Sequence, residues 1–185
     1  LIEISGGTYE QPRLLNLEGM EPVDEQSVPA STRAREAYFV DYAEAMRQQI
    51  TIPLMVTGGL RRLDAMNEAL KAECADMIGI GRPMCVVPDA PQQLLNGVPE
   101  LPRFEDTLSM LPRACSFLNR IKLIRTAGAF ATQYWFYEQI AALGRTGSTQ
   151  VEIGVMAATQ AQTKAANAWL AQRKAALTKT DETPV

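Results

Sequence analysis

Residues 50–83 read ITIPLMVTGGLRRLDAMNEALKAECADMIGIGRP, and this stretch decides the fold. Apolar runs of strand length occupy 50–57 and 75–80, and glycine follows each of them. Between the two runs, apolar side chains recur every three or four positions, as one face of a helix requires: Leu63, Met66 and Leu70. A strand, a helix and a second strand in this order predict a parallel βαβ unit.

The same alternation of strand and helix extends on both sides of this stretch. Residues 1–4 fit a short buried strand in which Glu3 requires a partner, and 33–49 has the spacing of an amphipathic helix. A shorter helix is expected over 90–96, with Gly97 as its stop. Three strands leave open sheet edges, so we expect other strands to complete the sheet, and the start inside a strand predicts a fragment of a longer protein.

The sequence has 185 residues and no histidine, which excludes several classes of active site. A Ser-His-Asp triad, a Cys-His pair and a histidine-containing zinc site all need a residue that this chain lacks. The net charge of −3 argues against a nucleic-acid surface, and no apolar run approaches the roughly 18 residues of a membrane span. The cysteines are widely separated, which predicts reduced thiols, a cytoplasmic location and no metal site: Cys74, Cys85 and Cys115.

The second half of the chain has a different character, and we predict a division into 1–97 and 98–185. The aromatic run 134–137 lies in an expected helix that ends at Gly144, and its spacing favours a core or interface role. The alanine-rich stretch 155–178 is expected to be helical and to pack on a partner chain, which would give a homo-oligomer. Residues 98–185 are therefore interpreted as a helical extension.

Two further stretches carry charge of opposite sign. Residues 8–32 are polar and acidic and are too long for a plain connector, which indicates a functional loop. Tyr9 within it either faces a site or is simply exposed. The basic stretch 103–125 is interpreted as a solvated face or as a partner of that acidic loop.

The chemistry is expected at the ends of the two apolar runs, where glycines follow. Ligands of parallel βα folds bind at the carboxyl ends of the strands, and glycine lets backbone N–H groups approach an anion. Arg82 adds a cation with bidentate geometry, and the helix after Gly59 is expected to direct its positive end to the same place. In (β/α)8 barrels the last two such junctions usually bind phosphate. The predicted site residues are Gly58, Gly59, Gly81 and Arg82.

Simpler interpretations of these residues stay open. The glycines would also serve merely to turn the chain, and Arg82 would also suit an ion pair with Asp76 or with the acidic loop. Arg61 either assists phosphate binding or is a solvated residue at a helix start. Cys85 is interpreted as a small buried apolar residue. The two junctions together, one helix apart, favour phosphate binding.

Several blocks of the first half resemble, in order, the C-terminal half of the old yellow enzyme family. The blocks are LIEISGGTYEQP (1–12), REAYF (35–39), IPLMVTGGLRRLDAMNEAL (52–70), ADMIGIGRPM (75–84) and PDAPQQLLNG (88–97). The resemblance implies the last three βα units of a TIM (β/α)8 barrel, an α/β fold. It also implies that Gly58, Gly59, Gly81 and Arg82 contact the phosphate of FMN.

The same resemblance implies an enzyme that passes hydride from NADH or NADPH through FMN to a small-molecule acceptor such as an electron-poor alkene. The family's first five strands have no counterpart here, so no catalytic residue is assigned and the isolated chain is expected to be inactive. Two alternatives stay open. One is a phosphate-binding barrel lyase or isomerase, and the other is a non-catalytic fragment that acts only through association.

Overall fold

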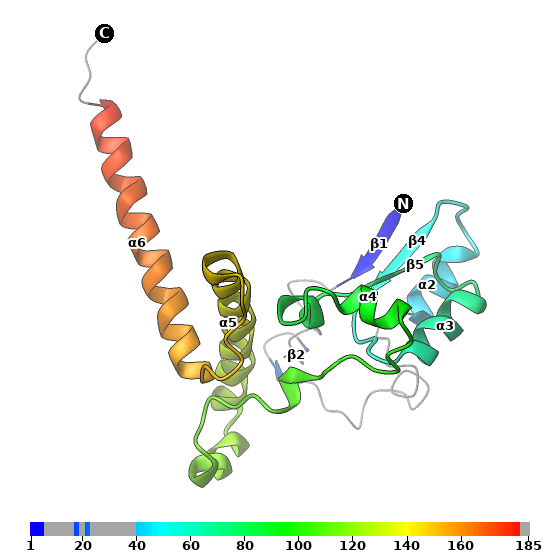
Figure 1. Ribbon diagram of the computed structural model, residues 1–185, viewed down its shortest axis with the longest axis horizontal. Helices are drawn as coiled ribbons and strands as arrows, with labels where there is room; N and C mark the ends of the chain where they lie inside the picture. Colours follow the sequence, from blue (N-terminus) through cyan, green and yellow to red (C-terminus); the bar gives the residue numbers. More distant parts are fainter. Residues whose placement is uncertain (6–16, 19–20, 23–39, 182–185) are drawn as a thin grey trace.

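The computed structural model describes residues 1–5, 17–18, 21–22 and 40–181 as an α/β unit followed by two long helices (Figure 1). A parallel sheet has the order β1 (Ile2–Ser5), β4 (Leu54–Thr57) and β5 (Met77–Gly79), and β2 (Leu17–Glu18) pairs antiparallel with β3 (Glu21–Pro22). The α-helices are α2 (Val40–Arg47), α3 (Leu63–Lys71), α4 (Ala90–Leu95), α5 (Lys122–Thr146) and α6 (Val155–Asp181). The 3-10 helices are η3 (Arg82–Cys85), η4 (Phe104–Asp106) and η5 (Arg113–Arg120).

The sheet is in register from end to end. Ser5 pairs with Thr57 and Thr57 pairs with Gly79, so the three strands finish at one edge. The hydroxyl of Thr57 donates a hydrogen bond of 2.8 Å to Glu3 Oε1, which supplies the partner that a carboxylate in a strand requires. The parallel sheet and the alternation of strands with helices confirm the α/β prediction.

The first hydrophobic core lies between the sheet and its helices. Val56 and Leu60 come from β4 and the residues after it, Met66 comes from α3, and all three are nearly inaccessible to solvent. Leu101 is 1% exposed and belongs to the same cluster, because residues 99–101 run along the start of α3. The predicted boundary between residues 97 and 98 stays a prediction.

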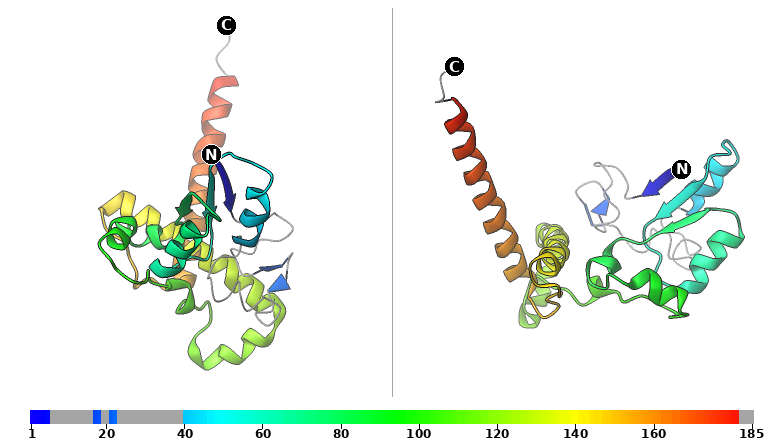
Figure 2. Two further views of the ribbon diagram at one scale, coloured as in Figure 1. Left: turned by 90° about the vertical axis from the view of Figure 1, so that its right-hand side faces the viewer. Right: turned by 45° about the horizontal axis from the view of Figure 1, so that its top comes forward.

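The second core lies where α5 meets the start of α6. Trp135 and Phe136 of α5 pack with Val155 and Ala158 of α6, and the indole N–H of Trp135 donates to the Ile153 carbonyl at 2.8 Å. In Figures 1 and 2, α5 lies between α6 and the sheet, and α6 extends beyond it. Core packing in this part therefore concentrates at the beginning of α6.

The observed elements correct several predicted boundaries. The helix predicted for 33–49 is seen over Val40–Arg47, and its predicted first part lies outside the described residues. The helix that carries the aromatic run continues past Gly144 to Thr146 and ends at Gly147, whose φ of 73° suits the left-handed stop. The aromatic run itself divides: Trp135 and Phe136 are buried, while Tyr134 and Tyr137 are exposed.

Candidate functional site

The two predicted glycine junctions lie side by side. Because Thr57 pairs with Gly79, the residues that follow β4 and β5 leave the sheet at the same edge. Gly58 and Gly59 have φ of 140° and 77°, conformations that strongly favour glycine. An added Cβ on Gly81 would meet no atom within 4 Å. The structure thus leaves room beside the backbone of Gly81, as a close approach by an anion requires.

Arg82 follows immediately and starts η3. Its side chain is 25% exposed, and its Nη1 lies 3.4 Å from Glu105 Oε1. The alternative partner Asp76 instead forms an ion pair with Arg47 and accepts the Leu54 N–H at 2.7 Å. The Arg47 hydrogen bond, more than that backbone contact, holds the pKa of Asp76 below its ordinary value.

Arg61 is buried, so its interpretation as a solvated residue is wrong. Only 4% of Arg61 is exposed, and its Nη2 donates to Glu105 Oε1 at 2.7 Å. Burial lowers the pKa of Arg61, with a smaller contribution from Arg82, and the nearby Glu105 carboxylate opposes this shift. Its Nε has no hydrogen-bond partner among the described residues. Arg61, Glu105 and Arg82 therefore form one connected ion cluster beside the strand ends.

The start of α3 contributes less to the site than its position suggests. The Leu63 N–H donates to the Pro99 carbonyl at 2.8 Å, and the Ala65 N–H donates to Asp64 Oδ1 at 2.8 Å. These N–H groups already have protein partners, so the expected anion contact with the helix N-terminus gains no support here.

Gly79 has a role that sequence reasoning missed. An ideal Cβ on Gly79 would lie 1.8 Å from Thr57 Oγ1 and 2.8 Å from Thr57 Cβ. Only glycine fits beside Thr57 at this point of the sheet without displacing it. A glycine inside a strand often marks such a close approach, so the signal was present in the sequence.

Other predicted positions have no established part in the site. Burial raises the pKa of the Cys85 thiol, which is partly buried against the second core. Tyr9 lies outside the described residues. Of the acidic stretch 8–32, only residues 17–18 and 21–22 are described. Within the described ranges, no group of three His, Cys, Asp or Glu side chains is arranged to hold a metal ion. No described helix is long and apolar enough to cross a membrane.

Curated proteins similar to this chain include flavin oxidoreductases. The chain is 32% identical over 148 residues to the NADH-dependent flavin oxidoreductase iccE of Talaromyces variabilis. This match covers 79% of the chain and 34% of iccE. It is 37% identical over 92 residues to the NADH-dependent flavin oxidoreductase iliE of Neonectria sp. (strain DH2). This match covers 49% of the chain and 12% of iliE. The chain thus spans about a third of iccE and a smaller part of iliE.

A shorter match is of a different kind. The chain is 36% identical over 76 residues to the imidazole glycerol phosphate synthase subunit HisF of Frankia casuarinae (strain DSM 45818 / CECT 9043 / HFP020203 / CcI3). This match covers 41% of the chain and 29% of HisF. No family model matches the chain. No solved structure matches it either. The similarity to the flavin oxidoreductases supports that class at a coarse level.

Proposed function

We propose that this chain is the part of an FMN-dependent NAD(P)H oxidoreductase that binds the phosphate of FMN. In this proposal the three βα units are the last units of a TIM barrel, and Gly58, Gly59, Gly81 and Arg82 contact the phosphate. The observation that carries the proposal is the adjacency of the two junctions: Thr57 and Gly79 are paired at the ends of β4 and β5, and Arg82 follows Gly81 at the start of η3. The names of iccE and iliE agree with this chemistry.

The residues present suit a phosphate group. The left-handed glycines after β4 and the open space beside Gly81 suit a bound anion close to the backbone. Arg82 supplies a guanidinium that remains partly accessible. A guanidinium binds phosphate in a bidentate manner, through two parallel N–H···O hydrogen bonds. These residues would hold and orient the cofactor at its phosphate end, and none is assigned to proton or hydride transfer.

FMN, when bound, would supply the hydride chemistry that links NADH or NADPH to a small-molecule acceptor. This chain contributes binding and orientation through the backbone after β4 and β5. The acceptor is proposed to be an electron-poor alkene or a similar compound.

Titration of the 185-residue chain with FMN and with riboflavin, which lacks the phosphate, tests the proposal. We expect the chain to bind FMN about tenfold more tightly than riboflavin, the gain expected for a charge-assisted contact. Arg82→Gln should remove that preference. Arg120→Gln, an exposed arginine on η5, is the matched control and should retain it. Equal affinities of the unaltered chain for the two flavins would contradict the proposal.

A second candidate keeps the phosphate site and changes the substrate. The match to a protein named as a synthase of imidazole glycerol phosphate favours a lyase or isomerase that acts on a phosphorylated small molecule. Glycerol phosphate, added at the same concentration as FMN, would then compete with it for the site. Arg82→Gln would lower the affinity for both ligands. Under the flavin proposal, glycerol phosphate competes poorly because it lacks the ring system.

A further inference from the structure

The carboxylate of Glu105 lies between two arginines at the edge of the proposed site. Its Oε1 is 2.7 Å from Arg61 Nη2 and 3.4 Å from Arg82 Nη1. Exposure rises along the cluster: the side chains of Arg61, Glu105 and Arg82 are 5%, 16% and 25% exposed. The cluster therefore runs from the protein interior outward to Arg82, its most exposed member.

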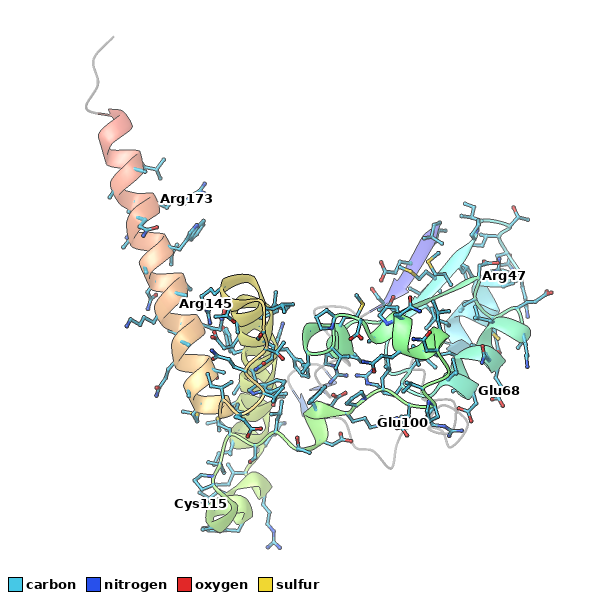
Figure 3. All side chains as sticks on the ribbon, in the orientation of Figure 1. Arg47, Glu68, Glu100, Cys115, Arg145 and Arg173 are labelled. Atoms are coloured by element: carbon cyan, nitrogen blue, oxygen red, sulfur yellow. The ribbon has the colours of Figure 1, made fainter. Side chains whose placement is uncertain are left out.

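Backbone contacts fix where Glu105 lies. The Leu101 N–H donates to the Arg61 carbonyl at 3.0 Å, and Arg62 and Glu100 form an antiparallel bridge. Leu101 is buried in the first core, and the Phe104 ring packs tilted against Trp135 in the second, with ring centroids 6.1 Å apart. Figure 3 shows Glu100 on the segment that leads from α4 toward η4. Glu105 is thus held between two packed side chains rather than carried on a free loop.

The contacts of Glu105 with the two arginines differ in length and in role. A buried guanidinium needs a counterion, and the 2.7 Å contact makes Glu105 the close partner of Arg61. The longer contact with Arg82 is an ion pair that leaves most of its five N–H donors available. Two guanidinium cations and one carboxylate leave a net positive charge, which suits an anion.

We propose that Glu105 is a positioning residue for the anion site, because it holds the Arg82 guanidinium beside the Gly81 junction before the ligand binds. The inference rests on the proposed function. A free arginine side chain loses much conformational entropy when a ligand fixes it in one rotamer. Because the carboxylate already holds the side chain in place, ligand binding costs less of this entropy. Glu105 itself makes no contact with the phosphate in this proposal.

The test compares FMN and riboflavin affinities of the full chain carrying Glu105→Gln. We expect the dissociation constant for FMN to rise about tenfold and that for riboflavin to change less than twofold. Asp106→Asn removes the same charge from the next residue of η4, whose side chain is exposed, and should change neither constant by more than about twofold. The effect on FMN alone is what distinguishes positioning from a general loss of structure.

The double variant Arg61→Met/Glu105→Gln removes the buried ion pair as a unit and so guards against misfolding. If Glu105 positions Arg82, the double variant keeps the weakened FMN binding. Recovery of FMN affinity in the double variant would overturn the inference, because Glu105 would then serve only to neutralise Arg61. Tighter FMN binding by Glu105→Gln would also overturn it, because the carboxylate would then be a competitor of the phosphate.

Failure of the proposed function has a separate signature. If the unaltered chain does not prefer FMN to riboflavin, the phosphate site is absent and the positioning role falls with it. If the unaltered chain prefers FMN and Glu105→Gln retains the full preference, only the positioning role fails.

Discussion

The sheet unit and the α5–α6 pair are stabilised in different ways. The sheet unit buries residues from strands, helices and the segment around Leu101 in one cluster. In the helix pair, α5 contributes Trp135 and Phe136, whereas α6 contributes only residues near its start, Val155 and Ala158. Residues 163–177 of α6 are all exposed. The sheet unit can therefore hold a site in fixed geometry, while most of α6 has no role in the core.

The similarity to iccE extends beyond the first half of the chain. The match to iccE covers 148 residues, which cannot fit within residues 1–97. It must therefore continue past residue 97. Glu105, which lies past that residue, contacts both arginines of the sheet unit.

The largest expected effect comes from the centre of the second core. Trp135→Ala should lower the free energy of unfolding by about 3–5 kcal/mol, the usual cost of truncating a buried aromatic side chain. Trp135 is 1% exposed, lies 5.1 Å from the Phe136 ring and hydrogen-bonds Ile153. Urea unfolding followed by circular dichroism measures the change. A loss below about 1 kcal/mol would mean that the α5–α6 core contributes little to stability.

The next effect tests the close packing of the sheet. Gly79→Ala should lower the free energy of unfolding by about 1–3 kcal/mol, because the new Cβ meets both Oγ1 and Cβ of Thr57. Gly144→Ala is the matched control within α5, where an added Cβ meets nothing within 4 Å. That change should raise stability by up to about 1 kcal/mol through helix propensity. Equal effects of the two substitutions would contradict the register of β4 and β5.

A smaller effect is expected from pH at the α5–α6 contact. Burial raises the pKa of Glu138, but hydrogen bonds from Gln162 and Arg145, both 2.5 Å, together bring that pKa below its ordinary value of 4.5. Because the folded pKa is lower than the unfolded one, this stabilisation is present above pH 4.5 and is lost as the pH falls through the folded pKa.

Glu138→Gln checks this sign directly. The variant should lose about 1.5 kcal/mol near neutral pH, the lower end of the range for hydrogen bonds to a charged group. The difference from the unaltered chain should shrink as the pH falls below 4.5. Stability curves for the two proteins that stay parallel across this range would contradict a lowered pKa of Glu138.

The elements were predictable from local patterns, while the ion cluster was not. The spacing of Leu63, Met66 and Leu70 and the two apolar runs predict the βαβ unit, because side-chain periodicity reports directly on helices and strands. Nothing local links Glu105 to Arg61, which are 44 residues apart and meet only through tertiary packing. Arginine is almost never fully buried without a partner, so the burial of Arg61 required knowledge of that distant carboxylate.

The smallest effect is expected at the exposed end of α6 and addresses the predicted association. Trp169 is 56% exposed and contacts only the Arg173 guanidinium among the described ring contacts, at 5.4 Å; Figure 3 labels Arg173 on this part of α6. Trp169→Ala should therefore change the free energy of unfolding by about 0.5 kcal/mol, the value of an exposed cation–π contact. The measurement is the unfolding experiment used for Trp135→Ala, repeated at two protein concentrations.

Concentration dependence decides what a larger loss would mean. If this end of α6 packs on a second copy, Trp169→Ala should cost more as the concentration rises, because association stabilises the folded chain by mass action. Gel filtration of both proteins would then show the variant eluting as the smaller species. A small loss at both concentrations, with identical elution, would contradict association through Trp169 and leave α6 stabilised by its first turns alone.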